Sequence, residues 1–413
     1  MMKSFDEIRT DAKRGARGPD VEEAPICSTA IVKIASRCNL NCSYCYVYNK
    51  GDDGWSRQPA VMSSETVTAL VERVRAHCRR HGLDRFHFVF HGGEPLLARR
   101  RFVEWFVAAA GAALAPDVEA RFSMQTNGVL LSREWARLLK RLGVHVGISM
   151  DGLPESHDRW RIDHKGRGSY RGVVAGFEAA RREGLDPGIL AVIDLAADPA
   201  EVYRHFAALR PRIVDFLLPQ ATWDDPPHRP RAAGYASWLL AIFALWSAEP
   251  SPPFRVRLFE QIIRSVLGIA DSLDALGRGA NAILVIETDG SIETVDVLRV
   301  CENGITRTAR NVRTDDLDDA LTDELPLAYY HSSDRLCATC EACAVREICA
   351  GGYLPHRFSR ANRFDNPSVY CEDLKALISA IQAWTVGQLP PDLVAATGLC
   401  ALSATVPVAA PQA

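Results

Sequence analysis

Short apolar runs alternate with longer amphipathic stretches through the first half of the chain. The apolar runs cover residues 30–35, 86–90, 121–125, 145–150, 189–194 and 213–218. Apolar side chains recur at helical spacing between these runs, in residues 63–81, 99–115, 132–142, 169–183 and 198–209. Strands that alternate with helices form a parallel sheet, so six such units predict an α/β fold, a partial (β/α)6 TIM barrel.

The second half of the chain follows a different pattern. The Pro-rich stretch 219–230 predicts a linker, and helical periodicity follows at 231–248 and 256–270. Alternating residues around Asp289-Gly290 predict a hairpin over 282–298, and a helix is expected at 372–386. We therefore expect an N-terminal extension (1–28), the barrel (29–218), a linker with bridging helices (219–280), a Cys-rich domain (281–386) and a mobile tail (387–413).

Composition excludes several classes of function. The net charge is −3, so no broad field attracts nucleic acid or a membrane surface. The chain has neither a run of 18 apolar residues nor a signal-peptide core near its start, which predicts a cytoplasmic protein. Twelve cysteines in such a chain indicate metal or redox ligands, because a reducing cytosol disfavours disulfides. Cys78 is an exception, since it continues an apolar helical stripe and is expected in the core.

Three cysteines lie together in the loop that follows the first predicted strand. Cys38, Cys42 and Cys45 have C-x3-C-x2-C spacing, one thiolate fewer than a complete four-ligand site requires. Three thiolates on a four-iron cluster leave one iron open to another ligand, which is typical of a catalytic site. A zinc knuckle with a borrowed fourth ligand is the alternative.

This loop resembles that of the radical S-adenosylmethionine (SAM) enzymes, whose C-x3-C-x-aromatic-C motif also includes Tyr44. Further landmarks follow the family's order at the ends of predicted strands, in residues 91–95 (HGGEP), 125–128 (QTNG) and 149–152 (SMDG). The resemblance implies a [4Fe-4S] cluster with an open iron, on which SAM is cleaved to a 5′-deoxyadenosyl radical that takes hydrogen from the substrate. It also implies that the HGGEP motif binds the methionine amino group and that Arg161 contacts the carboxylate. The implied SAM-binding residues are Tyr44, Gly92, Gly93, Glu94, Asn127, Ser149, Asp151 and Arg161.

A second cysteine group resembles the C-terminal SPASM extension of peptide-modifying radical enzymes. The matching residues, which the resemblance makes metal ligands, are Cys340, Cys343, Cys349 and Cys371. The family pattern would place another Cys where this chain has Tyr353, and the expected upstream cluster is reduced to Cys301. The resemblance therefore implies one auxiliary [4Fe-4S] cluster instead of two. Cys337 is a substitute ligand, and a zinc ribbon is the alternative, because four thiolates also suit zinc.

Residues 46–49, 55–59, 285–293, 351–358 and 364–371 resemble the FxsB-type maturases. Members of this group and its relatives modify ribosomally made precursor peptides, several of them by joining an aromatic ring carbon to a Cβ atom to give a cyclophane. The resemblance implies the same reaction here, with a flavodoxin- or ferredoxin-like electron donor. Thioether formation, epimerisation, side-chain oxidation and a non-catalytic iron–sulfur or zinc protein are the alternatives.

The crosslink requires a base, and the sequence offers candidates by residue type alone. Asp151 is taken as the catalytic candidate, together with Glu287, Asp289, Tyr353 and His356. For three of these a structural role is the favoured interpretation: a solvated strand face for Glu287, a turn for Asp289 and a satisfied polar contact for His356. Trp223, Trp238 and Trp246 are expected in the core rather than in a peptide pocket.

Overall fold

The computed structural model describes residues 25–228, 234–269, 275–277, 279 and 282–397. Six parallel strands form the centre of the sheet, and helices connect them, which confirms the predicted partial barrel. The strands are β1 (Thr29–Ala35), β2 (Arg85–Gly92), β3 (Glu119–Thr126), β4 (His145–Ser149), β5 (Gly188–Val192) and β6 (Ile213–Leu217). The connecting helices are α2 (Ser64–His81), α3 (Arg100–Leu114), α4 (Arg133–Arg141), α5 (Pro154–Trp160), α6 (Tyr170–Arg182) and α7 (Pro199–Leu209).

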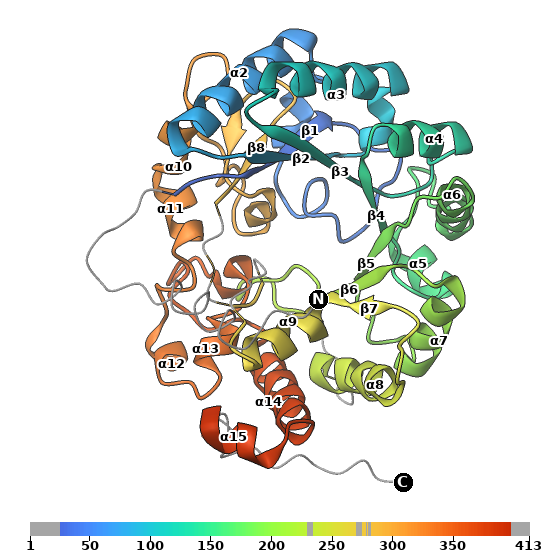
Figure 1. Cartoon of the computed structure of the whole chain (residues 1–413), viewed down its shortest axis with the longest axis vertical. Coiled ribbons are helices and arrows are strands. Elements are labelled where there is room, and N and C mark those ends of the chain that lie inside the picture. Colours follow the sequence, from blue (N-terminus) through green and yellow to red (C-terminus); the bar gives the residue numbers. More distant parts are fainter. Residues whose placement is uncertain (1–24, 229–233, 270–274, 278, 280–281, 398–413) are drawn as a thin grey trace.

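The strands follow an arc with these helices on its outer side (Figure 1). Local sequence signals set the limits of the helices. The Ser63 hydroxyl accepts the Thr66 N–H at the start of α2, and Gly82 ends this helix with a φ of 62°. Ser132 and Asp198 cap α4 and α7 in the same way. Cys78 is buried in the core, as predicted.

The sheet extends beyond the six barrel strands at both edges. The predicted hairpin forms from β8 (Ile283–Ile286) and β9 (Ile292–Glu293), and the short β7 (Arg255–Val256) pairs with β6. β8 pairs in parallel with β1, so the hairpin continues the barrel sheet in the order β7-β6-β5-β4-β3-β2-β1-β8-β9. The second arm of the hairpin is shorter than predicted, because the chain turns into the 3-10 helix η3 (Asp296–Val300).

The C-terminal region lies across the inner side of the arc (Figure 1). The long helix α14 (Cys371–Gly387) packs against α8 (Tyr235–Ala248) and α9 (Arg257–Val266), the two helices that follow the barrel. Shorter elements complete this region: α10 (Leu317–Leu321), α11 (Glu324–Tyr330), α12 (Ala338–Glu341), α13 (Arg346–Cys349) and η4 (Leu354–Arg357). Two short 3-10 helices, η1 (Gly54–Arg57) and η2 (Pro95–Ala98), instead follow β1 and β2 in the barrel.

The prediction of a mobile tail from residue 387 is wrong for its first part, which forms α15 (Pro391–Thr397). The rest of the tail and residues 1–24 of the predicted extension lie outside the described residues. None of the helices in the described part of the chain is long and apolar enough to cross a bilayer.

Candidate active site

The loop between β1 and η1 carries the first cysteine group. Backbone hydrogen bonds hold it against the barrel, from Asn41 N to Ile162 O (2.7 Å) and from Ser43 N to Trp160 O (3.0 Å). Cys38, Cys42 and Cys45 line a single cavity of about 430 Å³ together with residues from the carboxyl ends of the strands. Parallel barrels place their chemistry at this end of the sheet.

Most of the SAM-binding residues implied by the sequence line the same cavity. These are Tyr44, Gly92, Gly93, Asn127, Ser149 and Arg161. Gln125 orients Ser149 by donating a hydrogen bond from Nε2 to its hydroxyl (2.9 Å). Asn127 donates from Nδ2 to Asn39 Oδ1 (2.8 Å), which fixes its side chain beside the cysteine loop.

Glycine is required where the end of β2 meets the cysteine loop. A Cβ atom on Gly93 would lie 2.0 Å from the Tyr48 hydroxyl and 2.4 Å from Arg37 O. Gly92 has a φ of 138°, and a Cβ there would lie 2.0 Å from Ala35 O. The two glycines therefore bring backbone, not side chains, to the cavity wall.

Glu94 lies behind this wall and does not line the cavity. Its side chain is fully buried and accepts three hydrogen bonds, from Leu96 N (3.0 Å), Thr126 Oγ1 (2.7 Å) and Asn127 N (2.8 Å). Burial raises the pKa of Glu94 to about 7, against the opposing effect of these donors. Glu94 thus ties the end of β2 to the end of β3.

Asp151 also stands behind the cavity wall, where it organises two residues that face the cavity. Its Oδ2 accepts hydrogen bonds from the Tyr44 hydroxyl and from Arg161 Nε (3.0 Å), and its Oδ1 accepts one from Val192 N (3.1 Å). The Arg161 guanidinium lies over the Tyr44 ring at 5.4 Å from its centroid. With both oxygens engaged, Asp151 has the geometry of a positioning residue, whereas the sequence suggested a catalytic one.

The donor set of the cavity fits an iron–sulfur cluster with SAM. Burial raises the pKa of Cys38 to about 12 and that of Cys42 to about 11, so three neighbouring thiols stay protonated unless a metal replaces the protons. The His91 Nδ1 atom, which belongs to a residue lining the cavity, is buried and has no hydrogen-bond partner among the described residues.

Residues 32–201 match the family model described as the radical SAM superfamily. The barrel has the radical SAM fold. The protein is therefore an enzyme, and its cofactors are SAM and a [4Fe-4S] cluster.

Curated relatives extend the similarity beyond the barrel. A cysteine-type anaerobic sulfatase-maturating enzyme of Clostridium novyi (strain NT) is 23% identical over 357 residues, 84% of this chain and 93% of the relative. A serine-type anaerobic sulfatase-maturating enzyme of Klebsiella aerogenes is 27% identical over 337 residues, 80% of each chain.

Two solved structures share the fold. Native anSMEcpe with bound AdoMet has a TM-score of 0.75 at 22% identity, over 87% of this chain and 98% of that one. Streptococcus suis SuiB bound to precursor peptide SuiA has a TM-score of 0.56 at 14% identity, over 83% of this chain and 76% of SuiB.

The second cysteine group forms its own small cavity, about 20 Å³, beyond the radical SAM domain. Cys340, Cys343, Cys349 and Cys371 all line it. Helices α12, α13 and α14 bring them together, and Cys371 is the first residue of α14. Burial raises the pKa of Cys340 and of Cys349 to about 12. Four converging thiols fit a metal centre of the kind that the sequence predicts at this place.

Three other residues of the cysteine-rich region do not line the small cavity. Cys337 lies beside it, because its side chain forms a hydrogen bond with Cys340 that raises the pKa of Cys340. Cys301 is buried in an apolar cluster with Leu298 and Phe358. Tyr353, at the position where the family pattern has a Cys, lines the large cavity.

Of the candidate bases, Tyr353 and His356 line the large cavity, whereas Asp151, Glu287 and Asp289 do not. Asp289 is a turn residue as predicted, since its Oδ1 accepts the Ser291 N–H (2.9 Å). The prediction of a solvated Glu287 is wrong, because this residue is buried and pairs with Lys33 and Arg299. The satisfied contact expected for His356 is also wrong: its Nε2 atom is buried without a hydrogen-bond partner among the described residues.

The tryptophans lie outside the lining of the large cavity. Trp238 is buried in the core and Trp246 packs against it, as predicted. Trp223 is exposed, and its indole N–H donates to Pro367 O (2.8 Å), so the prediction of a core position is wrong for this residue.

Sequence reasoning missed a buried ionic group beside the cysteine loop, where the Tyr46 hydroxyl donates a hydrogen bond to Asp296 Oδ1 (3.4 Å). Lys33 Nζ pairs with Glu287 (2.8 Å) and with Asp296 (3.1 Å), which lines the cavity. Burial alone would raise the pKa of Asp296, but Lys33 and other nearby cations outweigh it and lower the pKa to about 2. The one available signal was the charged Lys33 within an otherwise apolar strand.

Proposed function

We propose that this enzyme modifies a ribosomally synthesised precursor peptide by joining an aromatic ring carbon to a nearby Cβ atom. The observation that supports it best is the large cavity, which opens from the cluster loop onto an apolar wall. This wall includes Leu190, Val192, Phe216, Leu217 and Leu239. Such a surface suits an aromatic side chain placed beside the source of the radical.

Polar atoms within the same cavity suit the amide groups of a peptide. His91 Nδ1, His356 Nε2 and Gln220 Oε1 are buried without hydrogen-bond partners in the described part of the chain. A buried polar atom without a partner is costly, so each is a place where a substrate N–H or C=O replaces the missing partner. The names of the relatives agree with a peptide substrate, since two are sulfatase-maturating enzymes and SuiB is seen with a precursor peptide.

In this proposal, the residues of the first cavity hold and orient the cofactors. Cys38, Cys42 and Cys45 bind the cluster, and Asp151 keeps Arg161 and Tyr44 in place to bind SAM. Together the two cofactors supply a carbon radical that takes a hydrogen atom from a C–H bond. The apolar wall excludes water, which would otherwise divert the substrate radical.

The metal centre proposed in the second cavity accepts the electron that crosslink formation releases. After loss of one hydrogen atom, restoring the aromatic ring requires loss of one proton and one electron. The thiols of Cys340, Cys343, Cys349 and Cys371 are the ligands proposed for one auxiliary [4Fe-4S] cluster as the electron acceptor. Tyr353 and His356 line the large cavity, and burial lowers the pKa of His356 to about 3, so its imidazole is neutral but a weak base. The group that accepts the proton stays unassigned. A flavodoxin- or ferredoxin-like protein is the proposed external electron donor.

A second candidate is oxidation of a Ser or Cys side chain to an aldehyde, which the names of the curated relatives favour. One feature of the second cysteine group weighs against side-chain oxidation. Among the described residues, the second cysteine group forms a single four-thiol cavity, with Cys301 buried elsewhere among apolar side chains.

The deciding experiment uses the reconstituted enzyme, SAM, a reductant and the peptide encoded beside its gene, without oxygen. We expect 5′-deoxyadenosine and a peptide product lighter by two hydrogens, and neither with the Cys42→Ala variant. Serine oxidation and thioether formation also remove two hydrogens, so the product is treated with a hydroxylamine probe for aldehydes and with a thiol alkylating agent. Three results together support the crosslink. The product does not react with the hydroxylamine probe, its thiols are still alkylated, and the peptide backbone between two of its residues does not fragment in tandem mass spectrometry. Aldehyde labelling establishes the second candidate, and an unchanged mass with inverted stereochemistry establishes epimerisation.

A further inference from the structure

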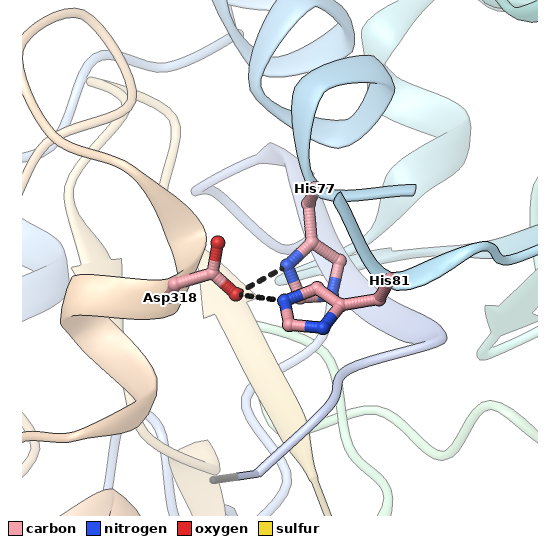
Figure 2. A group of neighbouring side chains, drawn as sticks. All are labelled: His77, His81 and Asp318. Carbon is pink, nitrogen blue, oxygen red and sulfur yellow. Dashed lines mark hydrogen bonds and ion pairs between the residues drawn. The ribbon is translucent and has the colours of Figure 1, made fainter. Parts of the chain in front are cut away.

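Two histidines and an aspartate converge far from both cysteine groups, between the barrel and the C-terminal region. His77 and His81 lie one turn apart on α2, and Asp318 lies on α10 (Figure 2). Asp318 Oδ1 is 2.8 Å from His77 Nδ1 and 2.7 Å from His81 Nε2. The three ligand atoms all lie within 4.8 Å of one another. Histidines at i and i+4 present their rings on one helix face, an arrangement that suits a shared metal ion.

The atoms around these three groups hold them as the outer shell of a metal site does. His77 Nε2 lies 2.9 Å from the carbonyl oxygen of Cys27, just before β1. The other oxygen of Asp318 accepts a hydrogen bond from Arg80 Nη1. Metal-binding histidines commonly donate their second ring N–H to a carbonyl, and metal-binding carboxylates are themselves hydrogen-bonded. Two of the three side chains therefore have fixed orientations before any ion arrives.

The number of N–H groups on the His77 ring shows why these contacts favour a bound cation. A neutral imidazole carries one N–H, but the ring nitrogens of His77 face two acceptors, Cys27 O and Asp318 Oδ1. If the proton lies on Nε2, the Nδ1 lone pair points at a carboxylate oxygen. A metal ion at Nδ1 satisfies both sides of the ring at once.

We propose that His77 Nδ1, His81 Nε2 and Asp318 Oδ1 bind one Zn²⁺ ion, with water as the fourth ligand. His77 is almost fully buried, whereas the side chains of His81 and Asp318 are 19% and 22% exposed, so solvent reaches the outer side of the site. Two imidazole nitrogens with one carboxylate are a donor set typical of zinc. The ion joins α2 of the barrel to α10 and has no part in the radical chemistry.

The size of the site agrees with this ion. Zinc bonds of about 2.0–2.2 Å to nitrogen and oxygen place the ligand atoms of a tetrahedron about 3.3–3.5 Å apart. Binding therefore requires each histidine nitrogen to move from the oxygen of Asp318 by roughly half an ångström. A small rotation of the partly exposed His81 side chain, with a slight shift of the Asp318 carboxylate, provides this movement without a change in the backbone.

The test uses the full holoenzyme with its cysteine sites already loaded with iron and sulfide, so that thiols do not compete for zinc. The enzyme is mixed with Zn²⁺ without oxygen and desalted, and bound zinc and iron are measured by mass spectrometry. We expect one zinc per chain in the wild type, a several-degree rise in Tm, and loss of both in His81→Ala. His145→Ala removes an exposed histidine on β4 and serves as the matched control, with zinc binding unchanged.

X-ray absorption at the zinc edge separates this site from adventitious binding to sulfur. Histidine scattering with ligands at about 2.0–2.1 Å supports the proposal, whereas a sulfur ligand at about 2.3 Å overturns it. A wild type that keeps no zinc overturns it equally, as does full zinc binding by His81→Ala. Because His77 is buried, Asp318→Asn is the second variant. It keeps the hydrogen-bonding shape but weakens the oxygen ligand, and unchanged zinc affinity in this variant also overturns the proposal.

Discussion

Two carboxylates that the sequence places in the cofactor site act in the structure from behind its wall. Glu94 joins the ends of two strands through backbone and hydroxyl donors, and Asp151 holds Arg161 and Tyr44. Neither lines the cavity. At this scale the motifs predict which residues gather at the carboxyl ends of the strands, but the direction in which each side chain points depends on neighbours far along the chain.

Glu94 gives the folded protein a distinctive dependence on pH. Its pKa rises from an ordinary value near 4.5 to about 7 in the fold, so between these values the folded state keeps a proton that the unfolded state has lost. The stability that Glu94 contributes is therefore present below pH 4.5 and is lost as the pH rises through 7, by about 1.4 kcal/mol for each unit of pKa shift. Anaerobic urea unfolding at pH 5.5 and 8 should show this loss in the wild type and not in Glu94→Gln. Equal pH dependence in the two proteins would contradict it.

The positioning role of Asp151 predicts a separation of binding from chemistry. Asp151→Asn leaves Arg161 buried without its carboxylate, which weakens SAM binding by roughly tenfold or more, on the order of 1–3 kcal/mol, while the iron content stays constant. Equilibrium dialysis with labelled SAM measures the affinity. A variant that binds SAM normally yet produces no modified peptide would instead establish Asp151 as the catalytic base.

Among the elements, α14 connects the two cysteine-lined cavities of the enzyme. Its first residue, Cys371, lines the small cavity, and Leu374 one turn later lines the large one. The rest of the helix packs on α8 and α9. A change at the start of this helix therefore reaches both the metal centre and the wall of the substrate cavity.

Removal of the thiol at the start of α14 tests the auxiliary cluster. Cys371→Ala should lower the iron content by up to about four atoms per chain, because this centre has no SAM to replace the fourth ligand, as the three-thiolate site does. Cys301→Ala is the matched control, since Cys301 is buried among apolar side chains, and its iron content should equal that of the wild type. Iron and sulfide assays after reconstitution give the result. Zinc in place of iron at this centre would favour the ribbon alternative, and equal iron loss in both variants would contradict the ligand assignment.

Across the whole molecule, charged side chains join the barrel to the region that follows it. Lys33 of β1 pairs with Glu287 after β8 and with Asp296 of η3, and Arg299 pairs with Glu287 and Glu293. All of these side chains are at most 5% exposed. Breaking one buried pair leaves a charge without a partner, which costs far more than breaking a pair in water.

Substitution of Lys33 measures this coupling. Lys33→Met should lower the free energy of unfolding by about 3–5 kcal/mol at pH 7, because Asp296 is then buried as an unpaired carboxylate. Lys50→Met, which breaks an exposed pair with Asp225, should cost about 1 kcal/mol or less. Urea unfolding of the reconstituted proteins compares them. Similar losses in the two variants would show that the buried network contributes no more than a surface pair.

How much of this molecule the sequence predicts depends on how far apart along the chain the interacting residues are. Periodicity and caps such as Ser63 are local, so the six barrel strands and five of their six connecting helices agree with the prediction to within a few residues. The short α5 was missed. The cysteine spacings were equally local. The pairing of β8 with β1 and the burial of Glu287 depend on contacts between residues hundreds of positions apart, which no local pattern contains. The orphaned His356 Nε2 is visible only once the cavity around it exists.

Two parts of the chain that lie far apart in the sequence enclose the large cavity. The three thiols of the cysteine loop line it together with Tyr353, His356 and Leu374, which follow more than 300 residues later. The chamber around the thiols therefore closes only when the C-terminal region is docked on the barrel. Local unfolding of that region alone exposes the cluster ligands to solvent and oxygen, so the shelter of the cluster depends on the docking and not on the barrel by itself.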